Sequence, residues 1–168
     1  MMAPALRQRG LTLIELMIGL GICAVLMSLA VPSFASYLQR QRLKAAAQGL
    51  ELDLREARYE SARRGAALNL VFMPGPDWCY AIASTPECDC HLQQPCRIKT
   101  VRAQDLRGVH LSDTHATRFD PASGNVDQPG TIAVWQAPGG EKVRVSVSPL
   151  GRPFACMTEG NLPPLPTC

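Results

Sequence analysis

Residues 9–34 read RGLTLIELMIGLGICAVLMSLAVPSF and decide how this chain is organised. The stretch is apolar from Leu11 onward, and Glu15 is its one acidic residue. The first ten residues of the chain contain two arginines and no acid. About 20 apolar residues in a helix span a bilayer core, and flanking basic residues stay on the cytoplasmic side. We therefore predict a leader over residues 1–10 and a membrane-spanning helix over residues 11–34.

Glu15 distinguishes two kinds of N-terminal signal. In an ordinary secretory signal, cleavage would follow the small-residue site at residues 33–35 and remove the apolar segment. A carboxylate at membrane depth is costly, so an acid at the start of the apolar core opposes this interpretation. The alternative is a cut on the cytoplasmic side after Gly10, which keeps the helix and makes Leu11 the new N-terminus. Glu15 is then the fifth residue, and we favour this second signal.

Residues 9–15 resemble the prepilin cleavage signature of type IV pilins and type II secretion pseudopilins. The resemblance implies that a prepilin peptidase cleaves between Gly10 and Leu11 and that Leu11 is then N-methylated. It also implies assembly with other pilins through the N-terminal helix, with Glu15 neutralising the amine of a neighbouring subunit. Pairing these charges relieves the cost of holding each alone in hydrocarbon. Pro32 is the twenty-second residue from Leu11, where pilins often carry a proline.

The helix is expected to continue beyond the membrane over residues 35–64. Small and apolar side chains recur there every three or four residues, which is typical of an amphipathic helix that covers a sheet. Arg63 and Arg64 occupy the last turn, and Gly65 follows as a helix end. The predicted apolar face consists of Leu43, Ala46, Ala47, Leu50, Leu54, Ala57 and Ser61.

Residues 65–168 are predicted to form a β-rich globular head, because the hydrophobic pattern changes there from helical spacing to alternation. Turn sequences rich in proline and glycine separate the alternating segments. The predicted fold class is α+β, with a long N-terminal helix packed on an antiparallel β-sheet head. The predicted strands cover residues 68–73, 78–83, 131–136, 142–147 and 152–157.

The predicted strand over residues 142–147 has the clearest alternation in the head. Its three valines occupy every second position and are expected to face inward. The residues between them are then expected to face outward, and these are Lys142, Arg144 and Ser146.

The head resembles the FimT/GspH family of minor pilins and pseudopilins. The resemblance rests on FDP at residues 119–121 with Gly124, on GTI at residues 130–132, and on VSPLGR at residues 147–152 with Cys156. It covers nearly the whole chain and implies a pilin-like fold. The glycine-arginine ending favours the pilus-associated branch of the family over the secretion branch.

Six of the seven cysteines lie in the C-terminal half of the chain. An even number in a small exported region indicates up to three disulfides and an oxidising compartment, the periplasm or beyond. We expect the last two to hold the tail and the other four to staple the loop over residues 78–97. Zinc ligation around residue 90 is the alternative, but disulfides explain the same residues without a metal. The six are Cys79, Cys88, Cys90, Cys96, Cys156 and Cys168.

The sequence offers one further candidate partner, which is DNA. No catalytic motif accompanies the three histidines, so we expect neither an enzyme nor a cofactor. Some FimT-like minor pilins bind DNA through a C-terminal Gly-Arg-x-Arg motif, but here Phe154 stands in place of the second arginine. Eight basic and nine acidic residues give residues 65–168 a formal charge of −1, without the basic excess typical of DNA-binding domains. The candidate DNA-binding residues are Arg97, Lys99, Arg102 and Arg107, joined by Arg144 and Arg152 if their strands are adjacent.

These patterns together favour a minor pilin of a type IV pilus, with a structural role in filament assembly or at the tip. The alternatives are a DNA-binding minor pilin for natural transformation and a pseudopilin of type II secretion. In each case we expect a single-pass inner-membrane protein with a periplasmic head, which later joins the pilus or pseudopilus.

Overall fold

The computed structural model describes residues 12–168 of the chain. Gly10 and Leu11, the predicted cleavage and methylation positions, lie outside these described residues. The chain divides between Tyr37 and Leu38 into two units. The helix α1, Leu13–Arg64, contributes to both units, and the eight strands belong to the second.

The first unit contains the apolar part of α1. The Thr12 hydroxyl oxygen accepts a hydrogen bond from the backbone N–H of Glu15 at 3.3 Å, which is the geometry of a helix N-cap. Every large apolar side chain over residues 13–37 is at least 55% exposed. By length and composition this helix is able to cross a membrane. Its apolar surface therefore has to be covered by something other than this chain.

The second unit contains the amphipathic part of α1. All seven residues of the predicted apolar face are buried, and Asp53 is buried with them. The helix ends at Arg64, where the N–H groups of Gly65 and Ala66 donate to the carbonyl oxygens of Ala62 and Ser61. This pair of bonds is a Schellman motif, and Gly65 adopts the positive φ of 61° that the motif requires.

Two antiparallel four-stranded sheets complete the second unit. In the first sheet the strand order is β3-β2-β1-β5, and in the second it is β4-β6-β7-β8. A short 3₁₀-helix, η1 (Ala103–Asp105), follows β3. The first sheet comprises β1 (Leu68–Met73), β2 (Cys79–Ala83), β3 (Arg97–Arg102) and β5 (Thr117–Phe119). The second comprises β4 (His110–Ser112), β6 (Gly130–Gln136), β7 (Lys142–Val147) and β8 (Pro153–Glu159).

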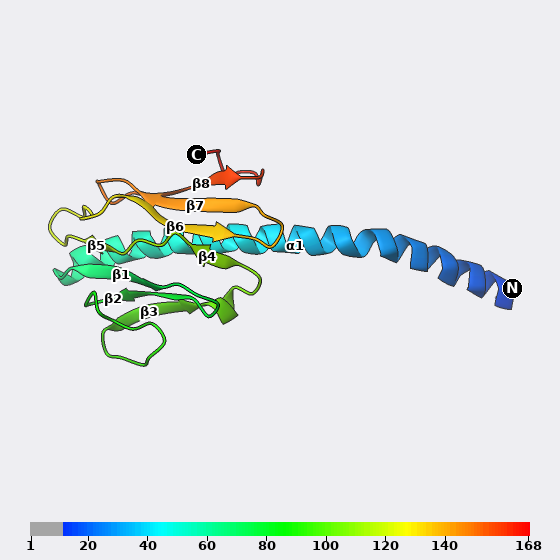
Figure 1. The fold of residues 1–168 in the computed structure, drawn as a ribbon, viewed down its shortest axis with the longest axis horizontal. Coiled ribbons are helices and arrows are strands. Elements are labelled where there is room, and N and C mark those ends of the chain that lie inside the picture. The colour runs from blue at the N-terminus through cyan, green and yellow to red at the C-terminus, as the bar shows by residue number, and fades with distance from the viewer. Residues whose placement is uncertain (1–11) are drawn as a thin grey trace, which may run out of the picture. The chain divides into compact units, whose positions relative to one another are not determined.

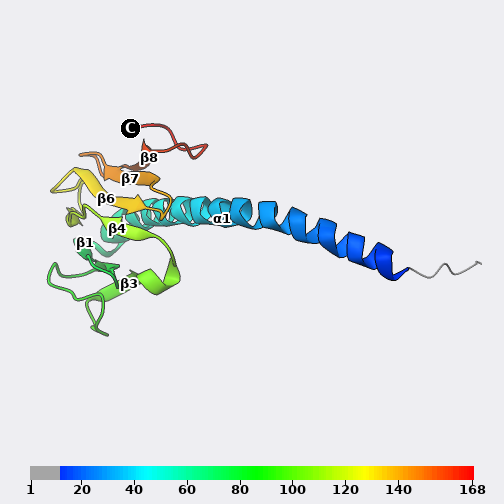
Figure 2. The same cartoon turned by 45° about the vertical axis from the view of Figure 1, so that its right-hand side comes forward.

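The main core of the second unit lies where both sheets meet the buried face of α1. Figure 1 shows β6, β7 and β8 on one side of this part of the helix and β1, β2 and β3 on the other, and Figure 2 shows β7, β8 and β3 on the same two sides. Two fully buried tryptophans connect the sheets, because the rings of Trp78 and Trp135 lie 4.9 Å apart, edge to face. Aromatic pairs of this geometry add to the stabilisation that comes from burial.

The observed architecture confirms the predicted α+β class and the two predicted hairpins, β1–β2 and β6–β7. Three strands were not predicted: β3, β4 and β5. The three valines of β7 lie in the main core as predicted, and Ser146 alternates with them, yet Ser146 is only 6% exposed. Ser146 pairs with Thr131 of β6 and Phe154 of β8, so a strand flanks it on each side.

Candidate functional site

Glu15 is the single charged residue over residues 13–37. Its side chain is exposed on a helix whose neighbouring side chains are apolar. A carboxylate in such surroundings needs a partner once lipid or other helices cover the helix. Residues 12–37, the described part of the first unit, contain no basic side chain, so the partner has to come from outside this segment.

The six cysteines of the head form three disulfides, Cys79–Cys90, Cys88–Cys96 and Cys156–Cys168. The first two staple the loop between β2 and β3, and the third holds the C-terminal tail against β8. His91 lies within 4.8 Å of Cys79 and Cys90, the grouping from which a zinc site would be built. Since the sulfur atoms of Cys79 and Cys90 are bonded to each other, the structure contains the predicted disulfide at this position.

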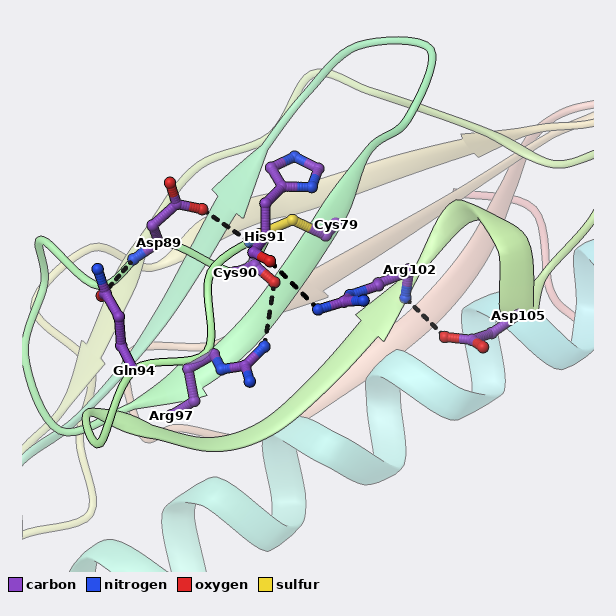
Figure 3. Close-up of a disulfide and its surroundings, with 8 residues drawn as sticks. All are labelled: Cys79, Asp89, Cys90, His91, Gln94, Arg97, Arg102 and Asp105. Atoms are coloured by element: carbon purple, nitrogen blue, oxygen red, sulfur yellow. Dashed lines mark hydrogen bonds between the residues drawn. A yellow bond between two sulfur atoms is a disulfide. The ribbon is translucent and has the colours of Figure 1, made fainter.

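Two basic residues of β3 hold the stapled loop in place (Figure 3). A terminal nitrogen of the Arg97 guanidinium donates to the carbonyl oxygen of Cys90 at 3.3 Å, and one of Arg102 donates to that of His91 at 3.3 Å. The backbone N–H of Arg102 also donates to the Asp105 carboxylate. These two guanidinium groups therefore have a structural use in shaping the loop around the disulfides.

Lys99 lies on the opposite face of β3 and belongs to a polar cluster between the strand and α1. Its ammonium group is 2.7 Å from a carboxylate oxygen of Asp53 and 3.1 Å from one of Glu56. The Tyr80 hydroxyl donates to the other oxygen of Asp53 at 2.9 Å. The hydrogen bond to Asp53 raises the pKa of Lys99. Burial, and then the charge of Asp53, raise the pKa of Tyr80 well above its ordinary value.

A bulge separates Lys99 from Arg97, whereas Arg102, three residues after Lys99 in regular register, lies on the other face of β3 by strand alternation. Lys99 pairs with Ile82 and Arg97 pairs with Ala83, so Ile98 is an extra residue in β3. An extra residue moves the next side chain to the other face of the sheet. Ile82 belongs to the core on the helix side and Ala83 to the separate cluster around the disulfides. The basic residues that are close in sequence are thus divided between two faces.

The other basic candidates lie elsewhere. Arg107 is exposed in the segment between η1 and β4, and its carbonyl oxygen accepts a hydrogen bond from Arg42. Arg144 lies on β7, which belongs to the second sheet and is not adjacent to β3. A single DNA-binding patch required the strand of Arg144 to lie next to β3, and in the described fold it does not. Binding of DNA by these residues stays a prediction.

Arg152 lines a groove of about 610 Å³ between α1 and two loops of the head. Arg58 reaches into it from the helix, and its Nε donates to the carbonyl oxygen of Gly124 at 3.0 Å. Sequence reasoning singled out Gly124 and Arg152 but missed the helix residues of the groove. These helix residues could have been found from their spacing of three, four and seven residues, which places them together on one side of the helix outside its apolar face. The groove is lined by Arg55, Arg58, Tyr59, Ala62, Pro121, Ala122, Ser123, Gly124, Gly151, Arg152 and Pro153.

Comparison with known families places the chain among the pilin and pseudopilin proteins. Residues 6–31 match the model of the prokaryotic N-terminal methylation motif. The matched residues include Gly10 and Leu11, the predicted cleavage positions. Residues 46–151 match the model of the type II transport protein GspH. Since this second match covers more than half of the chain, the protein belongs to the GspH family.

A relative in Thermus thermophilus, the pilin-like protein PilA1, is 44% identical to the chain over 69 residues. The matched segment covers 40% of this chain and 43% of the relative's length. No solved structure matches the chain.

Proposed function

We propose that this protein is a minor pilin, a subunit of a type IV pilus with a structural role in filament assembly or at the tip. The observation that carries the proposal is the exposed apolar helix over residues 13–37 with its single charge at Glu15. A helix of this composition is stable in a bilayer or in the core of a filament, where neighbouring helices cover it.

The proposed role proceeds in two stages. In the inner membrane, the basic leader stays cytoplasmic and the head lies in the periplasm. A prepilin peptidase then removes residues 1–10, and Leu11 is methylated. In the filament, the Glu15 carboxylate pairs with the N-terminal amine of a neighbouring subunit, which neutralises two charges in an apolar core. The role is structural and needs neither catalysis nor a cofactor.

A second candidate function is that of a pseudopilin in type II secretion. The match to the GspH family model supports it, because that model is described as a type II transport protein. The same helix and the same charge at Glu15 serve both assemblies. DNA uptake is a third candidate function, and deletion of the gene tests it as well.

Deletion of the gene in the source organism tests these functions side by side. Twitching, protein secretion and DNA uptake would be measured in the deletion strain and after complementation with the wild-type gene. We expect twitching and surface pili to be lost while secretion is retained. Loss of secretion alone would overturn the pilus assignment in favour of the pseudopilin, and loss of DNA uptake with normal pili would favour the DNA receptor.

Complementation with Glu15→Gln tests the observation that carries the proposal. This change keeps the size of the side chain but removes the charge that pairs with the amine. We expect normal amounts of the variant in the membrane fraction and at least about a tenfold loss from sheared filaments. Glu87→Gln, in an exposed loop of the head, is the matched control and should reach the filaments normally. Equal incorporation of both variants would count against the proposed role of Glu15.

A further inference from the structure

The groove beside Arg152 is positively charged and open. Three arginines line it, and none of its lining residues is acidic. Arg58 uses Nε for the bond to Gly124, which leaves its terminal nitrogens available as donors. Arg152 is exposed, and within residues 12–168 its side chain makes no hydrogen bond or ion pair. Only Arg55 is already paired, with Glu51 one turn earlier on the helix.

Two glycines fix the position of the Arg58 guanidinium. Gly124 and Gly151 both have positive φ, 67° and 70°. A Cβ atom at Gly124 would approach the Arg58 Nε to 2.8 Å, and a Cβ at Gly151 would collide with the Gly124 carbonyl oxygen. The loops that carry the two glycines therefore close on the arginine only because side chains are absent there. The charge of the groove is held in place before any ligand arrives.

The surroundings of the groove are apolar and exposed. Tyr59 lines it and is 69% exposed, and Leu150, immediately before Gly151, is 57% exposed. Leu52 lies two helical turns before Tyr59 on the same face of α1 and is 62% exposed. Arginine and aromatic side chains next to exposed apolar groups are typical of protein–protein interfaces.

This composition favours a protein carboxylate over a polyanion as the ligand. Non-specific DNA binding gains its affinity from several phosphate contacts along an extended surface. Here Arg97, Lys99 and Arg102 are engaged in contacts within the head, and the head has a net formal charge of −1. A compact site with two available guanidinium groups instead matches the geometry of a single carboxylate.

We propose that this groove receives an acidic side chain from a neighbouring subunit of the filament, bound between Arg58 and Arg152 with Tyr59 at the edge of the contact. The inference rests on the proposed function as a filament subunit. Contacts between two different surfaces of neighbouring subunits generate open helical assemblies. The groove supplies one such surface on the head, distinct from the apolar helix.

Site-specific photocrosslinking in cells tests the contact. A benzophenone amino acid would replace Tyr59 in the full chain, and crosslinked peptides would be identified by mass spectrometry after filaments are sheared. We expect crosslinks to another pilin subunit, in a peptide that contains aspartate or glutamate. Arg152→Glu should lower the crosslink yield by at least about fivefold, whereas Arg107→Glu, another exposed arginine of the head, should leave it unchanged.

A charge exchange makes the test specific. Replacing the acidic residue of the crosslinked peptide by arginine should restore the crosslink to the Arg152→Glu variant. If the protein enters filaments but gives no crosslink, or gives only nuclease-sensitive adducts, the groove proposal falls while the filament role stands. If the wild-type protein never leaves the membrane fraction, the proposed function fails and the inference fails with it. Equal yields from wild type and Arg152→Glu would also overturn the contact.

Discussion

Residues 13–37 and residues 38–64 of α1 have similar lengths, yet they place their apolar side chains in different environments. The first segment has one charged residue and exposes its apolar groups all round. The second buries one face against two sheets and carries charged residues on the other. Residues 38–64 bury their apolar side chains within the head, whereas the apolar side chains of residues 13–37 need a covering partner. Substitutions in the two segments should therefore affect different measurements.

The largest expected effect on the stability of the head comes from Leu50→Ala. Leu50 is fully buried between α1 and the sheets, so the substitution leaves a cavity and should lower the free energy of unfolding by about 3 kcal/mol. Urea unfolding of the full chain in detergent would be followed by tryptophan fluorescence. Both tryptophans of the chain, Trp78 and Trp135, are buried in the head and report on it alone.

Leu26→Ala is the matched control in the other segment of the helix. Leu26 is 60% exposed, so its truncation should leave the unfolding of the head unchanged within about 0.5 kcal/mol. The effect of this variant should instead appear in the recovery of filaments. If the two leucine substitutions destabilise the head equally, the division of α1 into an internally and an externally packed segment is wrong.

The next effect concerns the buried polar cluster, which only the second segment of the helix possesses. Tyr80 has its pKa raised by burial and by Asp53, so the folded state keeps a proton that the unfolded state releases near the ordinary value of 10.0. Stability is then fully present below pH 10 and is lost as the pH rises. We expect the free energy of unfolding to fall by about 1.4 kcal/mol per pH unit above that value. The raised pKa of Lys99 acts in the same direction.

Two conservative variants identify the source of this alkaline decline. Tyr80→Phe removes the ionisable hydroxyl, so most of the slope above pH 10 should disappear. Tyr59→Phe, at an exposed position of the same helix segment that carries Asp53, should keep the slope of the wild type. The measurement is urea unfolding at several pH values from about 9 to about 11.5. A decline that is unchanged in Tyr80→Phe would contradict the assignment to the buried cluster.

The parts of the fold that follow from local sequence were predictable. The Gly65 helix end and the apolar face from Leu43 to Ser61 were read directly from spacing, as were the β1–β2 and β6–β7 hairpins. The strand β3 was missed because its sequence, RIKTVR, interrupts apolar positions with cations. The strands β4 and β5 have three residues each, too few for a periodic signal, and pairing with longer strands defines them.

The distribution of the basic side chains was not predictable, because it depends on a bulge and on sheet membership. Sequence proximity suggested that Arg97, Lys99 and Arg102 form one patch. Strand alternation places Lys99 and Arg102 on opposite faces, and the extra residue Ile98 moves Arg97 to the face of Arg102. Asp53 could have been noticed as an acid within the apolar face of the helix. Its partners, Tyr80 and Lys99, come from strands far along the chain. Such contacts are set by tertiary structure and leave no local pattern.

The smallest effect is expected on the charged outer face of the second segment, near the end of α1. The Glu60 carboxylate accepts hydrogen bonds from Arg63 and Arg64, and these bonds lower its pKa from 4.5 to about 2. The interaction is therefore present above pH 4.5 and is lost as the pH falls toward 2.

A carbon-detected NMR titration should show Glu60 ionising near pH 2 in the wild type. In the double variant Arg63→Gln and Arg64→Gln, its pKa should return toward 4.5, while Arg55→Gln should leave it unchanged. Because all three side chains are in contact with water, solvent screening keeps the change in unfolding free energy small. An unshifted Glu60 in the wild type would show that these ion pairs do not persist in solution, and would leave the buried face as the whole source of the difference between the two segments.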